Sequence, residues 1–500
     1  MNWDLRNYHF YNGYAIMTGR VSKDYAPAQL QTFLNPFLDI LHYSLIRWLP
    51  PKVAGFILGA VHGINLYLLF IISLWVLPIK RVPKQIVSLM CAILGMYAPT
   101  AVSEVGTTMG DLTLSPLVLG GLYYLLKSCS NPRESAKWLL FSGFLFGSAA
   151  GTKLTFSPYV VAAAIALLIV HRNTHLPTND GLVYARTFLL FAAGSALGFV
   201  LTDGYWAILL YTHFKNPFFP FFNQLFKSPY ALPTSCRDLR WLPKTVGEYL
   251  MLPFSFVGLG PHRILELPFN AIRFPLALVL TVVYAMMSCW TRMRKKDCTT
   301  ANEFNLLLTF FVVSVSIWAA IFSYYRYLAP LELMAPLLIV LLIFHVFSTS
   351  KSRCLSVSLA FLLMVGTMKA PNWGRLPWRD SNYFGTSVPL IPGLKEGTVI
   401  MTSYSPTAFL LPSFPVETRF VRVQSNFDPA ASEKWQREIR DVLTSHSGPF
   451  FLLTTKDGFQ EASSILRGYG FMPIQERCAE ITNCLEPVDL YELRRINLNN

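Results

Sequence analysis

Long apolar runs dominate the first three quarters of the chain. Several of them hold few charged residues and are long enough to cross about 30 Å of hydrocarbon as helices. With the shorter runs they predict ten membrane crossings, at 53–77, 85–100, 112–127, 138–152, 155–170, 187–210, 273–291, 304–322, 328–347 and 354–369. The pattern therefore predicts an α-helical polytopic membrane protein with a transmembrane helical domain over residues 53–370.

The segment before the first crossing, residues 1–52, is predicted to be an outer loop. Within it Gln29–Trp48 is amphipathic and is interrupted by Pro36, so we expect it to lie in the membrane interface. The first apolar run starts too late for a cleavable signal peptide, so we expect none. An outward N-terminus without an inserting helix suggests that one more transmembrane helix is missing before Asp4; the alternative is direct outward insertion.

The tail, residues 386–500, changes character. Strand-like stretches at 398–402, 420–423, 450–454 and 490–493 alternate with helical stretches at 432–443 and 460–467. Such alternation predicts a small soluble α/β domain. Cys478 and Cys484 lie together in this tail and could form a disulfide if it is extracytoplasmic, the alternative being two free thiols.

Composition and charge agree with a membrane protein. The 500 residues are 53% hydrophobic and only 14% charged, where about a quarter charged is ordinary for a soluble domain. The net charge of +14 does not indicate nucleic-acid binding, because many basic residues sit in short loops between apolar runs. Short basic loops mark the cytoplasmic side. The N-terminus and the tail are then both outside, at the plasma membrane (the bacterial inner membrane).

Few charged residues lie at the outer ends of the predicted crossings. Glu104 and Asp111 join two crossings, Lys153 stands in the next tight outer turn, and Arg326 stands in a later one. Ionisable groups at membrane depth are costly and mark functional sites by default. The alternatives are a solvated Glu104, helix capping by Asp111, snorkelling of Lys153 and pairing of Arg326 with Glu332.

Two other outer segments carry polar and aromatic side chains. In a helical N-terminal segment Asp4, Tyr8 and Tyr11 would share one face, and with Asn7 and Asn12 they would suit contacts to a sugar or acceptor. The long outer loop 211–272 is rich in proline and aromatics. It is predicted to be an interfacial lid or platform, or alternatively an aromatic belt.

The order of these features resembles the GT-C class of membrane glycosyltransferases. That class includes the protein O-mannosyltransferases and the enzymes that add aminoarabinose to lipid A. The resemblance covers about residues 1–370 and rests on short motifs taken in order: the acid Asp4, the acids Glu104 and Asp111, the turn Gly151-Thr152-Lys153, and Tyr325-Arg326-Tyr327-Leu328-Ala329-Pro330.

The resemblance implies a sugar transferred from a polyprenyl-phosphate carrier to a glycan, lipid or protein acceptor, with inversion, at an extracytoplasmic active site. Asp4 would be the general base. Glu104 and Asp111 would orient the acceptor, or with Asp4 hold a divalent metal such as Mg²⁺ or Mn²⁺, which some members use. Lys153 and Arg326, with His9, would neutralise the carrier phosphate as it leaves.

Two other functions stay open at this point. A transporter or flippase of lipid-linked sugars should show repeats and ionisable groups near the bilayer midplane, whereas these acids and cations fall at one face. A non-catalytic membrane scaffold would tolerate Asp4→Asn and Lys153→Ala. Neither the sugar nor the acceptor is identified by any motif.

Overall fold

The computed structural model describes residues 1–80, 82–130, 135–173, 181–260, 262–293, 302–376 and 383–496. Some basic residues of the predicted cytoplasmic loops lie outside these ranges: Arg81, Arg133, Arg294, Lys295 and Lys296. The chain forms two compact units, both assembled from separated segments. The first unit comprises Met1–Phe56, Asp203–Arg237 and Gly374–Asn500, and the second comprises Ile57–Thr202 and Asp238–Trp373.

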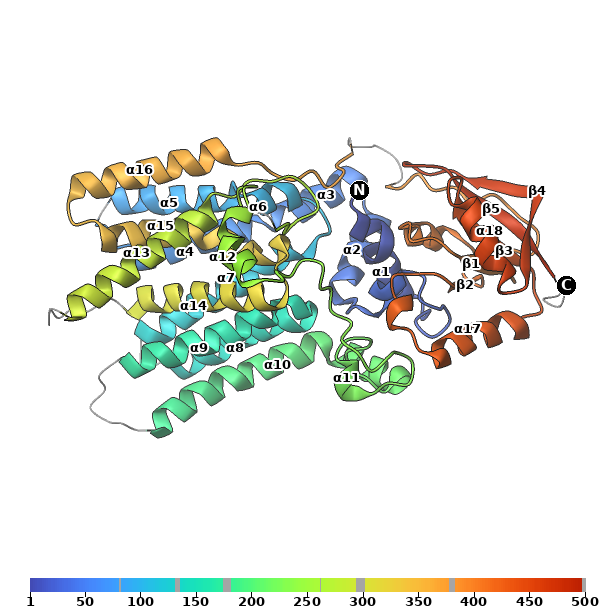
Figure 1. Cartoon of the computed structure of the whole chain (residues 1–500), viewed down its shortest axis with the longest axis horizontal. Coiled ribbons are helices and arrows are strands. Elements are labelled where there is room, and N and C mark those ends of the chain that lie inside the picture. Colours follow the sequence, from blue (N-terminus) through green and yellow to red (C-terminus); the bar gives the residue numbers. More distant parts are fainter. Residues whose placement is uncertain are drawn as a thin grey trace. The chain divides into compact units, whose positions relative to one another are not determined.

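The second unit is helical, and the ten predicted crossings lie largely on helix, with breaks after Ala60 and after Met96 (Figure 1). The helices are α3 (Pro51–Ala60), α4 (Gly63–Val76), α5 (Val82–Met96), α6 (Pro99–Glu104), α7 (Gly110–Ser130), α8 (Ser135–Thr152), η4 (Leu154–Phe156), α9 (Ser157–Asn173), α10 (Gly181–Phe214), α12 (Val246–Ser255), α13 (Arg273–Met293), α14 (Asn302–Ile321), η5 (Tyr325–Leu328), α15 (Ala329–Val346) and α16 (Ser350–Thr367). Helices α3 and α10 continue into the first unit.

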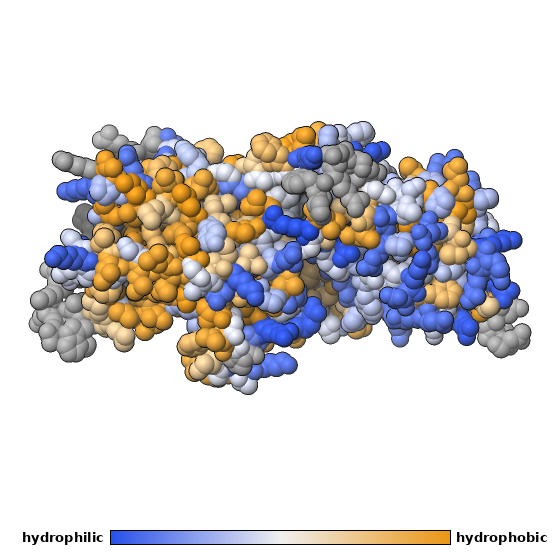
Figure 2. Space-filling view, turned by 90° about the horizontal axis from the view of Figure 1, so that it is seen from above, coloured by the Kyte–Doolittle hydropathy of each residue, from blue (hydrophilic) through white to orange (hydrophobic). Residues whose placement is uncertain are grey.

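Five stretches of the described chain are long and apolar enough to cross a membrane: Pro51–Val76, Gly110–Cys129, Leu182–Phe214, Asn302–Ile321 and Tyr325–Val346. The helices α5, α9 and α13 add shorter apolar stretches. Figure 2 shows many hydrophobic side chains on the surface of the helical part of the chain. Exposed apolar residues such as Leu197 and Val200 lie on these helices. The polytopic membrane class is confirmed, and the count of ten crossings stays a prediction.

Helix α15 forms the centre of this unit. Every residue from Ala329 to Ile343 is buried, and the helix packs against α5, α7 and α13. A helix that is apolar on all sides belongs inside a bundle, because no face of it is suited to water. Its first turn therefore holds the adjoining η5 segment in a fixed place.

Helices α8 and α10 meet along a row of glycines. On α8 they are Gly143, Gly147 and Gly151, and on α10 they are Gly194 and Gly198. A Cβ on Gly147 would lie 2.0 Å from the carbonyl oxygen of Ser195, which no side chain permits. Glycines four apart allow this backbone contact between membrane helices. The last glycine of this seam, Gly151, lies two residues before Lys153, so the seam positions the turn that carries the lysine.

The first unit is built on a five-stranded mixed sheet in the order β2-β1-β3-β5-β4. Its strands are β1 (Thr398–Met401), β2 (Arg419–Arg422), β3 (Phe450–Thr455), β4 (Phe471–Ile481) and β5 (Val488–Arg495). The first three run parallel, and β5 is antiparallel to both β3 and β4. Short elements link them: η6 (Ala408–Ser413), η7 (Asp428–Ala430), α17 (Glu433–Ser445) and α18 (Phe459–Arg467).

The N-terminal segment belongs to this same unit. It forms η1 (Leu5–His9, a π-helix), α1 (Phe10–Met17), η2 (Gln29–Phe33) and α2 (Phe37–Trp48). Side chains alternate across a strand, so Val399 and Met401 pack in one core with Tyr11 and Tyr14 of α1, whereas Ile400 packs in another core with α17 and α18. The N-terminal helices thus cover one face of the sheet. The sequence alone assigns these helices and the sheet to separate parts of the chain.

A buried ion pair fastens the N-terminal segment to the sheet. Arg20 binds Asp24 through Nε at 2.7 Å and Nη2 at 2.9 Å, and it also donates to the carbonyl oxygens of Val416 and Thr418. Tyr25 then pairs beside β2, donating to Phe420 O at 2.9 Å. Residues about 400 positions apart are therefore joined by backbone and side-chain bonds together.

The predicted outer loop 211–272 divides between the units, its residues up to Arg237 in the first and the remainder in the second. Phe219 is fully buried and packs on Phe33 and Phe427 inside the first unit. Asn223 holds the following turn by donating to Ala231 O at 2.9 Å. This part of the loop is therefore a packed piece of the first unit, and its buried aromatics are core residues.

Candidate active site

Four of the predicted site residues come together in the second unit, and we call them the acid–cation cluster: Glu104, Asp111, Lys153 and Arg326. Glu104 ends α6, and Asp111 lies in the first turn of α7. The connection between them turns at Gly106, which has a φ of +73°. Lys153 follows α8 directly, and Arg326 lies in η5. Helix ends from three parts of the chain thus supply the cluster.

The two acids of the cluster are held by different partners. The Nζ of Lys153 lies 2.6 Å from the Oδ1 of Asp111, and the backbone N of Leu112 donates to Glu104 Oε2 at 2.9 Å. Both carboxylates are fully buried. Within the described residues, Glu104 Oε1 and Asp111 Oδ2 have no hydrogen-bond partner. Buried polar atoms nearly always have one, so these two oxygens are available to a ligand.

The pKa of the Glu104 carboxyl reflects the charged groups around it. Burial raises the pKa of its carboxyl well above the usual range, Asp111 raises it further, and Arg326 and Lys153 oppose the shift. All three other members of the cluster therefore act on Glu104.

Aromatic rings surround the two cations. Lys153 Nζ lies 5.3 Å from the centre of the Tyr327 ring, while Arg326 Cζ lies 5.3 Å from Tyr324 and 5.2 Å from Trp373. The side chain of Lys153 keeps 24% of its surface exposed. Partly exposed cations held over rings suit an anionic ligand. Sequence reasoning missed these rings, although the tyrosines flanking Arg326 were a signal.

Glu332 has a different role from the one considered for it. Its Oε2 accepts from the backbone N of Thr100 at 3.0 Å, and its Oε1 accepts from the Tyr325 hydroxyl. Arg273, also fully buried, lies near it and donates to the carbonyl oxygens of Leu94 and Tyr97 at 3.0 and 2.8 Å. The pairing of Arg326 with Glu332 is therefore not what the structure shows.

The other predicted residues lie in the first unit. Asp4 precedes η1 and is partly exposed, and Tyr8 is largely buried with its ring 4.0 Å from that of His9. His9 Nδ1 lies 2.5 Å from Asp39 Oδ1. Leu5–His9 is a π-helix, whereas the predicted face of Asp4, Tyr8 and Tyr11 assumed α-helical spacing, so their shared face stays a prediction.

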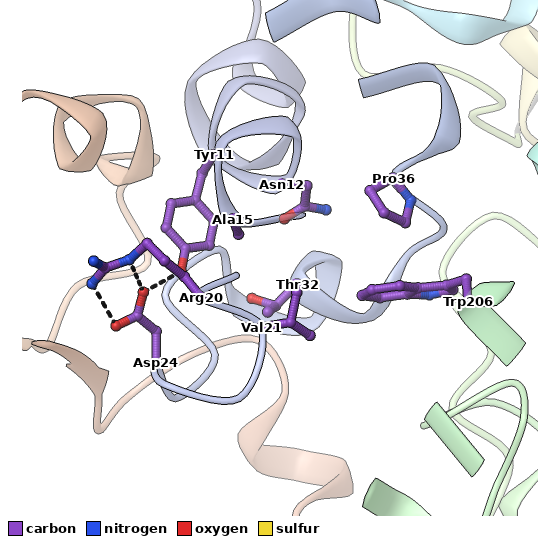
Figure 3. A pocket seen from close by; sticks show the side chains of 9 residues that line it. All are labelled: Tyr11, Asn12, Ala15, Arg20, Val21, Asp24, Thr32, Pro36 and Trp206. Carbon is purple, nitrogen blue, oxygen red and sulfur yellow. Dashed lines mark hydrogen bonds and ion pairs between the residues drawn. The ribbon is translucent and has the colours of Figure 1, made fainter. Parts of the chain in front are cut away.

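Three of the predicted sugar contacts are buried and take part in bonds within the unit. Asn7 Nδ2 donates to Ala28 O at 3.2 Å, and Asn12 Nδ2 donates to Gln31 O at 2.9 Å. The Tyr11 hydroxyl donates to Asp24 Oδ2 at 2.6 Å, beside Arg20, at a hollow that Trp206 also lines (Figure 3). The structure gives these groups partners that stabilise the segment, and their contact with a sugar stays a prediction.

The cysteines and the predicted metal set can be placed as well. Cys478 lies on β4 as a free thiol, so the predicted disulfide with Cys484, which lies in the loop after that strand, is not formed in the structure. The Cys484 sulfur instead lies 3.6 Å from that of Met1. Glu104 and Asp111 belong to the second unit and Asp4 to the first, so a metal shared by the three stays a prediction.

Comparison with known families bears directly on the second unit. Residues 56–197 match the sequence profile of the family described as dolichyl-phosphate-mannose-protein mannosyltransferase. This match supports a GT-C class glycosyltransferase. It spans Glu104, Asp111 and Lys153 of the acid–cation cluster. No curated protein matches the chain.

The GT-C resemblance drawn from the sequence is thereby confirmed. With the long apolar helices, the match indicates a membrane glycosyltransferase, and the family implies a lipid-phosphate-linked sugar donor. The acceptor, the sugar and the sidedness go beyond this match.

Proposed function

We propose that this GT-C glycosyltransferase moves a sugar from a polyprenyl-phosphate carrier to an acceptor at the extracytoplasmic face, with inversion at the anomeric carbon. The observation that carries the proposal is the acid–cation cluster, in which the Lys153–Asp111 pair lies beside the buried Glu104. Phosphate oxygens would bind Lys153 and Arg326, both of which are partly exposed.

Each residue has a distinct task in this proposal. Asp4 accepts the proton of the attacking acceptor hydroxyl, as the resemblance implies. Lys153 and Arg326 stabilise the negative charge that the carrier phosphate gains when the bond to the sugar breaks. Asp111 holds the ammonium group of Lys153 in place, and Glu104 with its uncommitted Oε1 orients a hydroxyl group of a substrate.

The test is transfer of labelled sugar from a polyprenyl-phosphate donor in membranes that carry single variants. Asp4→Asn should lower the transfer rate by about 10²- to 10⁴-fold, as expected for loss of a general base. Lys153→Ala and Arg326→Ala should each lower it by about 10²- to 10³-fold. The matched control is Lys137→Ala, an exposed lysine in the first turn of α8, the helix that Lys153 follows.

Mass analysis of surface glycans gives the answer in cells. A deletion strain should lose one sugar from its polysaccharide or lipids, wild type should restore it, and Asp4→Asn should not. Full rescue by Asp4→Asn would remove Asp4 as the base. An unchanged glycan profile in the deletion strain would contradict the transferase proposal itself.

A further inference from the structure

A second cluster of chemically active side chains lies in the first unit. Of its members, only His9 is among the site residues predicted from the sequence. His9 is the last residue of η1, and Asp39 and His42 lie three apart on α2, so they share one side of that helix. All three are buried, with exposed fractions of 6%, 2% and 0%. One ligand atom from each lies within 4.8 Å of the others.

The imidazole of His42 gives the clearest indication of a bound group. Among the described residues neither of its ring nitrogens has a hydrogen-bond partner, and the Nε2 of His9 has none either. Leaving a buried polar atom unpaired costs about 1–3 kcal/mol. An imidazole offers only one of its nitrogens to a given ion, so the unpaired nitrogen of His42 that lies near Asp39 points to a bound group.

The positions of these side chains suit ligation. His9 Nδ1 lies 2.5 Å from Asp39 Oδ1, and His42 Nδ1 lies 3.9 Å from the same oxygen. One nitrogen of each imidazole is therefore close to the carboxylate, and the three ligand atoms are near enough to one another to bind a single ion.

We propose that His9, Asp39 and His42 bind a divalent transition-metal ion, with Zn²⁺ as the best match. Two imidazoles and one carboxylate suit zinc and its first-row neighbours. Magnesium and calcium prefer sites made of oxygen alone. In this proposal His9 is a metal ligand and not a contact of the carrier phosphate.

The ion would tie η1 to α2 at the point where the two segments already pack closely. A Cβ on Gly13, one turn after His9, would lie 2.3 Å from Asp39 O and 2.5 Å from the Cβ of Tyr43. The backbone of α1 therefore touches α2 directly. A metal bridging His9 and His42 would fix the segment that begins at Asp4. The proposal does not depend on the transferase function.

The experiment measures metal in the full-length protein, purified in detergent with an affinity tag that lacks histidine. Zinc content, and cobalt binding followed by its visible absorption, are measured for wild type, His9→Ala, Asp39→Ala and His42→Ala. Wild type should bind zinc stoichiometrically, and each variant should bind it at least about 10-fold more weakly. His213→Ala, an exposed histidine of the same unit, should bind like wild type.

One further variant guards against misfolding. His42→Cys keeps a ligand at this position, so it should still bind cobalt and should add a sulfur-to-cobalt charge-transfer band. Wild-type protein that binds no zinc or cobalt at micromolar concentration would overturn the proposal whatever the variants do. Unchanged zinc affinity in folded His42→Ala would overturn it too.

Discussion

The ammonium group of Lys153 lies 2.6 Å from the Oδ1 of Asp111, a side chain with no exposed surface. Removal of the lysine leaves a buried carboxylate without its cation. We expect Lys153→Ala to lower the free energy of unfolding by about 2–3 kcal/mol, less than for a fully buried pair because Lys153 is partly exposed. Thermal unfolding in detergent measures this.

A double-mutant cycle separates this effect from catalysis. Lys153→Met with Asp111→Leu replaces both charges by apolar groups, so its stability should exceed that of Lys153→Met alone. Its transfer activity should stay low. Equal stabilities for the single and double variants would contradict the coupling of the two side chains.

Glu104 and Glu332 are both buried, yet substitution of Glu332 should lower stability, whereas substitution of Glu104 should lower transfer activity. Both oxygens of Glu332 have partners, whereas only one oxygen of Glu104 does. Glu332→Ala should cost about 3–5 kcal/mol of stability, as expected when a buried network is broken. Glu104→Gln keeps the bond from Leu112, so it should retain the melting temperature and lose transfer activity. Thermal unfolding scans and transfer assays of both variants at one pH test this prediction.

The glycine seam between α8 and α10 predicts a sharp steric effect. Gly147→Ala would force a methyl group against Ser195 O, so the two helices must separate and overpacking costs about 1–3 kcal/mol. Gly366→Ala on α16 is the control, because nothing lies within 4 Å of its added Cβ. Melting temperatures should fall for the first variant only.

The buried pair of Arg20 and Asp24 should be essential for the first unit. Arg20→Ala removes the partner of Asp24 and two bonds to the carbonyls of Val416 and Thr418, so we expect a loss of about 3–5 kcal/mol. Arg240→Ala breaks a largely exposed pair with Asp238 and should cost below about 1 kcal/mol. Limited proteolysis between residues 374 and 496 would reveal the difference. Equal resistance of both variants would contradict it.

Much of the fold could be predicted because its physical causes are local. Apolar length indicates the membrane helices, and the ten runs are largely helical in the structure. Pro36 interrupts the amphipathic segment where expected, since η2 ends at Phe33 and α2 begins at Phe37. Strand β4 was missed because it lies at the edge of the sheet, where Pro473 and the exposed Gln475, Glu476 and Arg477 hide the alternation.

The candidate site was predictable in part for a similar reason. Acids and cations at the ends of apolar runs stand out against their surroundings, so Glu104, Asp111, Lys153 and Arg326 could be selected. What could not be predicted is pairing over distance. Arg20 meets Thr418 because the N-terminal helices cover the sheet, and His9 meets His42 because η1 and α1 pack against α2. No periodicity in these segments indicates either contact.

The bond from Arg20 to Thr418 also sets an order of events during synthesis of the protein. A ribosome adds about 5–20 residues per second, so roughly 20–80 s separate the emergence of Arg20 from that of its partner. During that interval all of the long apolar helices are synthesised, and the first fifty residues have not yet gained the sheet on which they pack. A chaperone that shields Tyr11, Tyr14 and the Arg20–Asp24 pair during this wait would act before the last strands exist.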